Sequence, residues 1–313
     1  MAAKKKTKTM RISKLGYILA VSMFAICLQA CNKEKAEPEE AAYPILFGSY
    51  DTRSTANLDN LKNDGFKVYA YLEGNTGNNT TFDRVVTYNS TQNVWSYEGL
   101  QYWIPETSYW FKAFYPSTLT AGTYNISNTT SAQNYTITGL DITKQEDVMV
   151  ASASTSVPTG ALSPATGSVV YLQFQHIMSN VTIKVKSQVD GVTIQKITLG
   201  GVATNATYNG SVWNSSNTTS IVYNTPTTLI KGADYVDVTS GGILVIPEQA
   251  TNKQLTVVAN KTYNVTIPAG TWESGKKYTY TLLIKQDDIV FVDNAPYVEV
   301  WDSENATGSV IIK

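Results

Sequence analysis

Apolar and polar residues alternate with a period of two along several segments of this chain, and no other feature limits the possible fold as much. Every second residue is apolar or aromatic in residues 66–70, 181–185 and 278–284. Successive side chains of a β-strand point to opposite faces, so each segment is predicted to form a strand with one buried face. Abundant Tyr and a low charged fraction of 16% also favour strands joined by polar turns. We therefore predict an all-β fold.

Two dipeptides mark predicted tight turns. Asp190-Gly191 and Asn209-Gly210 each separate two predicted strands and tolerate the positive φ that hairpin turns need. Each is therefore predicted to close a β-hairpin. The chain has no long apolar stripe at helical spacing, but Leu58 and Leu61 lie three residues apart and indicate short helical turns in residues 56–62.

Cys31 ends an N-terminal segment that resembles a bacterial lipoprotein signal. Six basic residues lie at or before the start of an apolar stretch at residues 15–28, and Leu28-Gln29-Ala30-Cys31 follows the pattern of a lipobox. That stretch is shorter than the roughly 20 residues that span a bilayer, so the lipid is the expected anchor. We predict a signal peptide over residues 1–30, cleavage before Cys31 and lipidation of its thiol. The alternative is an ordinary secretory signal with a chance cysteine.

Residues 31–42 are polar and strongly charged, a composition that predicts a flexible tether. Their acidic residues resemble an export signal to the outer face of the outer membrane in some Gram-negative bacteria; a solvated periplasmic linker is the alternative. Cys27 would leave with the signal peptide and Cys31 would be lipidated. The folded part would then have no thiol for a disulfide or a metal site.

The charge balance limits the expected partners. The chain has 24 basic and 25 acidic residues, and the predicted signal peptide removes six basic residues and no acidic one. The mature chain then has 18 basic and 25 acidic residues, a net charge of −7. Nucleic-acid binding relies on a surplus of Lys and Arg, so the sequence predicts no nucleic-acid partner.

A stretch poor in large apolar side chains, residues 152–168, contains two prolines and two glycines. We interpret it as the join between two β-domains, residues 43–157 and 168–313, with a linker at 158–167. A long loop inside a single domain is the alternative.

Six runs resemble the fimbrillins, the pilus-subunit family of Gram-negative gut and oral anaerobes. In chain order they are Ile45-Leu46-Phe47 with Asp51-Thr52-Arg53-Ser54, Ser108-Tyr109-Trp110-Phe111-Lys112-Ala113-Phe114-Tyr115-Pro116, Glu146-Asp147-Val148-Met149-Val150-Ala151, Leu172-Gln173-Phe174-Gln175-His176-Ile177-Met178-Ser179-Asn180-Val181, Leu244-Val245-Ile246-Pro247-Glu248-Gln249 and Trp272-Glu273-Ser274-Gly275-Lys276-Lys277-Tyr278-Thr279-Tyr280. Each run alone is weak, but six in order over nearly the whole mature chain are fairly specific. Glu248 departs from the family pattern as an inserted residue.

The resemblance implies two β-sandwich domains of transthyretin-like type that assemble by strand exchange between subunits. It implies a structural subunit of a fimbria that acts in adhesion, with other fimbrial subunits as partners. Together with Cys31, it predicts a surface-exposed protein anchored by lipid in the cell outer membrane. A surface glycan-binding lipoprotein that uses exposed Tyr and Trp is the alternative.

Arg53 is the predicted processing site. The resemblance implies that an arginine-specific protease cuts there in polymerising subunits, which would free the apolar strand before it and open a groove for strand addition. An ordinary surface arginine is the alternative. At the other end, residues 296–301 and 309–313 flank a polar turn and are predicted to form a hairpin. It either covers an edge of its own domain or fills the groove of the next subunit.

Catalytic and metal-binding groups are few. His176, the only histidine, lies among apolar residues of a predicted strand, where a satisfied core or interface histidine is expected. One histidine without a thiolate disfavours zinc, and no Asp-x-Asp-x-Asp-Gly spacing indicates calcium. Adjacent Asp287 and Asp288 are interpreted as a strand-end turn. The sequence predicts no enzyme, no cofactor and no metal.

Aromatic residues offer one candidate binding surface, a platform on which sugars stack. Its candidates are Tyr71, Trp95, Tyr102, Trp103, Tyr109, Trp110 and Trp213. In an aromatic-rich sandwich such residues more often pack in the core or at strand edges, and we prefer that interpretation.

Overall fold

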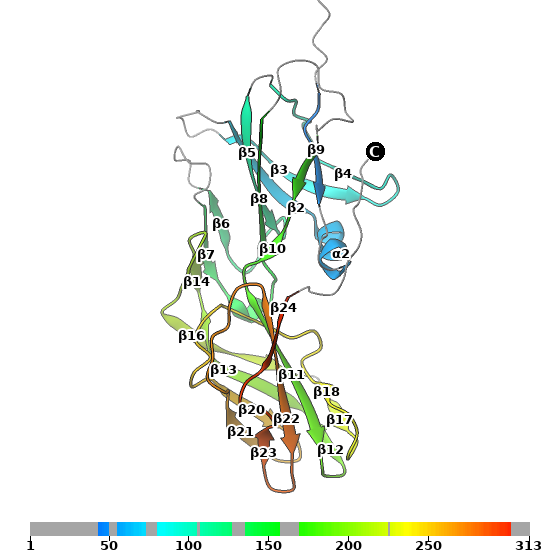
Figure 1. Ribbon diagram of the computed structural model, residues 1–313, viewed down its shortest axis with the longest axis vertical. Helices are drawn as coiled ribbons and strands as arrows, with labels where there is room; N and C mark the ends of the chain where they lie inside the picture. The colour runs from blue at the N-terminus through cyan, green and yellow to red at the C-terminus, as the bar shows by residue number, and fades with distance from the viewer. Residues whose placement is uncertain are drawn as a thin grey trace, which may run out of the picture. The chain divides into compact units, whose positions relative to one another are not determined.

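A computed structural model describes residues 43–49, 55–72, 80–104, 107–126, 135–156, 169–224 and 226–301. In this part of the chain there are 24 strands, one α-helix and one short 3-10 helix, η1 (Ile142–Lys144), so the all-β prediction is confirmed (Figure 1). The predicted helical turns belong to the α-helix, α2 (Thr55–Asp64), which buries Leu61. No helix among these residues combines the length and apolarity needed to cross a membrane.

A six-stranded antiparallel sheet contains the first predicted strand. Its order is β10 (Gln175–His176), β8 (Met149–Ser156), β5 (Ser108–Tyr115), β2 (Phe66–Leu72), β3 (Thr80–Asn89) and β4 (Val94–Ser96). Phe66, Val68 and Ala70 of β2 are completely buried, while Lys67 and Tyr69 between them are half-buried. The alternation therefore identifies the core-facing side of this strand correctly.

A parallel pair of short strands covers the same core. β1 (Leu46–Ser49) pairs with β9 (Val169–Leu172) over four residues. Ile45 and Phe47 are each 1% exposed and belong to a hydrophobic cluster with α2 and the six-stranded sheet. β9 and β10 come after the predicted linker yet pair with strands that precede it.

A two-layer sandwich contains the other two predicted strands. In one sheet β11 (Ser179–Ser187) pairs in parallel with β22 (Lys276–Ile284) over eight residues, side by side in Figure 1. β18 (Val236–Asp237) and β19 (Ile243–Val245) also pair with β11, and β23 (Ile289–Phe291) and β24 (Tyr297–Val300) pair with β22. The second sheet has the order β16 (Asn217–Tyr223), β13 (Lys196–Thr204), β20 (Gln254–Val258) and β21 (Thr262–Thr266). Buried residues of both sheets form one hydrophobic cluster.

A further four-stranded sheet joins segments that are distant in the sequence. Its order is β15 (Trp213–Asn214), β14 (Ala206–Tyr208), β7 (Tyr135–Leu140) and β6 (Thr123–Ile126). Ile137 and Leu140 of β7 belong to the hydrophobic cluster of the sandwich. Gln145 accepts a hydrogen bond from the backbone N–H of Leu244 at 2.9 Å and donates one to its carbonyl at 3.0 Å. Each of the two hydrophobic clusters contains residues from before and after the predicted linker. The domain division at residues 158–167 stays a prediction.

The two predicted hairpin turns have different outcomes. The hairpin at Asn209-Gly210 is confirmed, because β14 and β15 pair antiparallel around it and Gly210 has φ +91°. The hairpin prediction at Asp190-Gly191 is wrong. Gly191 does turn the chain, with φ +69°, but β11 continues to β12 (Val192–Ile194), which pairs with β17 (Thr227–Leu229) instead. A local turn signal cannot distinguish a hairpin from a corner that takes the chain to another sheet.

Candidate functional site

The segment 43–49 fills a slot in the first hydrophobic cluster. The Ile45 N–H donates to the Gln101 carbonyl at 2.8 Å, and the Tyr97 hydroxyl donates to the Ile45 carbonyl at 2.7 Å. The Phe47 ring lies edge-on to Phe111, with centroids 5.7 Å apart. Backbone pairing on both sides of this segment, together with its buried apolar side chains, makes it a strand inserted into a core.

The C-terminal strand β24 is bound much more loosely. It pairs antiparallel with the first half of β22, while β23 pairs with the second half. Its apolar side chains face solvent, with Tyr297 68%, Val298 46% and Val300 37% exposed. The predicted first arm of the C-terminal hairpin is therefore a strand that covers an edge of its own sandwich. The second arm, residues 309–313, lies outside the described residues.

Trp301 fixes the end of β24. Its indole stacks on the imidazole of His176, with centroids 3.7 Å apart. The backbone N–H of Trp301 donates to the Gly275 carbonyl at 2.8 Å. The His176 ring nitrogen Nδ1 lies 2.9 Å from the Asp147 carboxylate. His176 is 7% exposed and thus occupies the satisfied, buried position expected from its strand. Its partners Asp147 and Trp301 could not be predicted from the sequence, since neither carries a local signal that points to a histidine.

Other candidate residues are separated or structural. Asp287 and Asp288 are exposed in the turn between β22 and β23, as interpreted from the sequence. In the described ranges no three His, Cys, Asp or Glu side chains form a group that could hold a metal ion. Cys31 and Arg53 lie outside the described residues.

The aromatic candidates are mostly core residues. Tyr71, Trp95, Trp103 and Tyr109 are between 0% and 7% exposed, which confirms the packing interpretation for these four. Tyr102 is 48% exposed, whereas Trp110 and Trp213 are half-buried. Because four of the seven candidates are buried, little of the candidate platform is open to a sugar.

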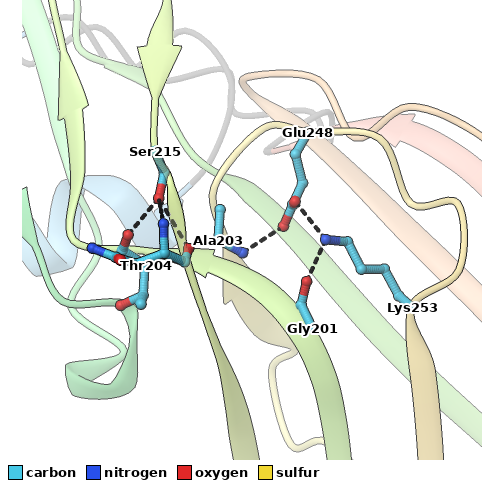
Figure 2. Close-up of polar contacts among 7 residues, drawn as sticks. Gly201, Ala203, Thr204, Ser215, Glu248 and Lys253 are labelled. Carbon is cyan, nitrogen blue, oxygen red and sulfur yellow. Dashed lines mark hydrogen bonds and ion pairs between the residues drawn. The ribbon is translucent and has the colours of Figure 1, made fainter.

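A largely buried acid–base pair occurs at Glu248, the residue that departs from the fimbrillin pattern (Figure 2). One Glu248 carboxylate oxygen accepts from the Ala203 N–H at 2.7 Å, and the other lies 2.6 Å from the Lys253 ammonium. Lys253 also donates to the Gly201 carbonyl. Gly201 has φ +77° and lies in a β-bulge of β13. Since these groups satisfy one another, we interpret the cluster as a brace for the bulge.

Comparisons with known proteins identify a family and similar folds. A family model described as fimbrillin-like matches residues 52–301. A fimbrial protein from Bacteroides vulgatus is similar in structure, with 18% identity, a TM-score of 0.57, and coverage of 82% of this chain and 99% of that one. A candidate cell adhesion protein from Bacteroides uniformis has 19% identity, a TM-score of 0.54, and coverage of 85% and 100%. A search of curated proteins finds no match. At these identities the structural likenesses establish the fold alone.

Proposed function

The chain belongs to the fimbrillin-like family, and from that premise we propose that it is a structural subunit of a cell-surface fimbria. In this proposal it assembles with other fimbrial subunits by strand exchange and acts in adhesion. A fimbrial family favours a structural over an enzymatic role. The observation that carries the proposal is a contrast between the two ends of the described chain, where β1 is inserted into a core and β24 lies exposed at an edge.

The acceptor in this proposal is the slot that segment 43–49 fills. Cleavage at Arg53 would separate that segment from the rest of the chain. Loss of Ile45 and Phe47 would expose the apolar wall that includes Phe111, and the backbone groups that β1 pairs on β9 would lose their partners. An added strand with alternating apolar side chains would satisfy both needs.

The donor in this proposal is β24. Its valines contribute little to the core of its own subunit, because both are exposed there. Release of the strand therefore forfeits four residues of edge pairing, the Lys277–Glu299 ion pair at 3.6 Å and the Trp301 contacts. In a neighbouring groove Val298 and Val300 would instead fill apolar pockets.

Controlled cleavage tests the acceptor. Full-length protein treated with an arginine-specific protease should begin at Ser54 and form ladder-like oligomers that survive mild denaturation. Arg53→Ala should remain unassembled under the same treatment. Equal assembly by Arg53→Ala would contradict the requirement for cleavage, and a start at Cys31 in every assembled copy would suit an anchor or tip subunit.

Truncation tests the donor. A chain that lacks residues 294–313 should fold and attach to the membrane but form no fibres by electron microscopy. Normal fibres from the truncated chain would exclude donation by β24. Wholesale unfolding, measured by circular dichroism, would favour the alternative in which β24 covers an edge of its own sandwich.

Lipidation of Cys31 is the proposed anchor. Cys31→Ala should abolish incorporation of radiolabelled fatty acid and release the protein from the outer-membrane fraction, since several buried acyl chains are needed for stable attachment. Continued sedimentation of a labelled Cys31→Ala protein would overturn this assignment.

A further inference from the structure

A polar pocket of about 530 Å³ lies between the six-stranded sheet and the turn that joins β14 to β15. Its volume falls in the range of small-molecule sites. Eight of its eleven lining residues have polar side chains; one of them is a lysine and none is an acid. This excess of positive charge is notable in a chain whose acidic residues outnumber its basic ones.

Lys112 of β5 provides the charge. Its ammonium lies 4.7 Å from the centroid of the Tyr135 ring and is hydrogen-bonded to the Ser152 hydroxyl. In the described part of the chain no carboxylate forms an ion pair with it, and burial lowers the pKa of its side chain. A partly buried ammonium without a counter-charge favours an anionic ligand.

Another wall of the pocket consists of closely packed aromatic side chains and a hydrogen-bonded turn. Tyr135 and Tyr208 are 6% and 8% exposed, with ring centroids 5.9 Å apart, and Trp213 packs on Tyr208 at 4.9 Å. Asn209 accepts hydrogen bonds from the Ser211 N–H at 3.1 Å and the Val212 N–H at 2.8 Å, which fix the turn. A preformed wall lowers the entropy cost of binding.

We propose that this pocket binds a carboxylate-bearing sugar of a surface glycan, such as a uronic or sialic acid residue. The ligand carboxylate would pair with Lys112. Its hydroxyls need donors and acceptors together, which the amides of Gln175 and Asn209 and the hydroxyl of Ser211 provide at the rim. Peptides are typically bound by open strand edges or apolar pockets instead. Only three of the eleven lining residues lack a polar side chain, so the pocket fits a sugar better than a peptide. The inference names a ligand for the adhesion proposed above and rests on that function only for its biological setting.

Calorimetric titration of the detergent-solubilised full-length protein tests the ligand. Glucuronic acid and N-acetylneuraminic acid are the probes, glucose has the ring without the carboxylate, and acetate has the carboxylate without the ring. We expect at least one acidic sugar to bind about tenfold more tightly than glucose or acetate, because both parts of the site are then used. Equal binding of glucose, or binding of a triglutamate peptide but no sugar, would overturn the proposal.

Two variants assign the binding to this pocket. Lys112→Gln should lower affinity for the acidic sugar about tenfold or more, while Lys285→Gln, the same change in an exposed turn, should not. Gln175→Ala changes an exposed side chain at the rim and should weaken binding several-fold without affecting the fold. Unchanged affinity in folded Gln175→Ala and Lys112→Gln proteins would place the sugar elsewhere and refute the site.

Fibre assembly and adhesion can be measured separately in cells. Cells with the Lys112→Gln protein should form normal fibres by electron microscopy yet bind surfaces coated with the acidic sugar more weakly. Absence of fibres from wild-type cells would count against the fimbrial role but leave the binding result intact. Full adhesion by Lys112→Gln cells that display normal fibres would count against the pocket.

Discussion

The indole of Trp301 lies flat against the imidazole of His176, with 3.7 Å between ring centroids and 4° between ring planes. This contact joins the end of the exposed strand β24 to a histidine that is itself paired with Asp147 at 2.9 Å. Trp301 is half-buried, in contrast to the exposed side chains at 297, 298 and 300. The stack therefore anchors a strand that otherwise has few side-chain contacts.

Trp301→Ala should loosen β24 without unfolding the sandwich. An aromatic contact of this kind contributes about 0.5–1.5 kcal/mol beyond its buried area, so the amides of β24 should exchange with solvent roughly tenfold faster. Hydrogen exchange measured by mass spectrometry checks this, with the strands β13 and β20 as internal reference. Tyr297→Ala, which removes an exposed ring from the same strand, is the control. Equal protection of β24 in wild-type and Trp301→Ala proteins would exclude the anchoring role.

Substitutions of Glu248 and Lys253 should have non-additive effects on the free energy of unfolding. Glu248→Ala removes the acceptor of the Ala203 N–H and leaves the Lys253 ammonium largely buried without its partner. We expect a loss of about 2–4 kcal/mol in the free energy of unfolding, measured by urea denaturation. Adding Lys253→Met should recover part of that loss, because the unpaired charge is removed. A double variant whose loss equals the sum of the single losses would contradict coupling between the two side chains.

Substitution of Tyr71 by phenylalanine should have little effect on the free energy of unfolding. The Tyr71 hydroxyl is buried and has no hydrogen-bond partner in the described residues, and burial raises its pKa to about 12. Tyr71→Phe should therefore change the free energy of unfolding by less than about 1 kcal/mol at neutral pH, or increase it. Between pH 10 and 12 the tyrosine ionises in the unfolded but not in the folded chain, so wild-type stability falls as pH rises. Tyr71→Phe should lose part of this alkaline sensitivity in urea titrations, and a profile parallel to wild type would contradict the assignment.

Local patterns predicted individual strands better than their partners. The alternation in β2, β11 and β22 identifies strands whose core-facing residues are buried. Nothing in it predicts that β11 and β22 pair in parallel, because that register depends on contacts between distant segments. The same limit explains the wrong hairpin prediction at Asp190-Gly191.

The family runs could be recognised because several of their residues make specific, largely buried hydrogen bonds. Trp272 is 1% exposed and its Nε1–H donates to the Tyr280 hydroxyl at 3.1 Å, while the Tyr278 hydroxyl accepts from the Glu273 N–H at 2.8 Å. The Ser179 hydroxyl donates to the Glu273 carbonyl at 2.7 Å. The pocket residues Lys112, Tyr135 and Tyr208 belong to strands that are distant in sequence, so no single run could have predicted the site.

Binding of an acidic sugar should weaken as the pH becomes alkaline. Burial lowers the pKa of Lys112 below its ordinary value, so its ammonium loses its proton at a lower pH than an exposed lysine does. Burial raises the pKa values of Tyr135 and Tyr208, so both stay neutral over that range, and the sugar carboxylate stays ionised. Affinity for the acidic sugar should therefore be constant from about pH 6 to neutral and fall on titration towards the lowered pKa of Lys112. Calorimetry across this range checks the prediction, with Lys112→Gln as a control whose weaker binding should not vary. A wild-type affinity that stays constant until ordinary lysines titrate would show that Lys112 does not meet the carboxylate.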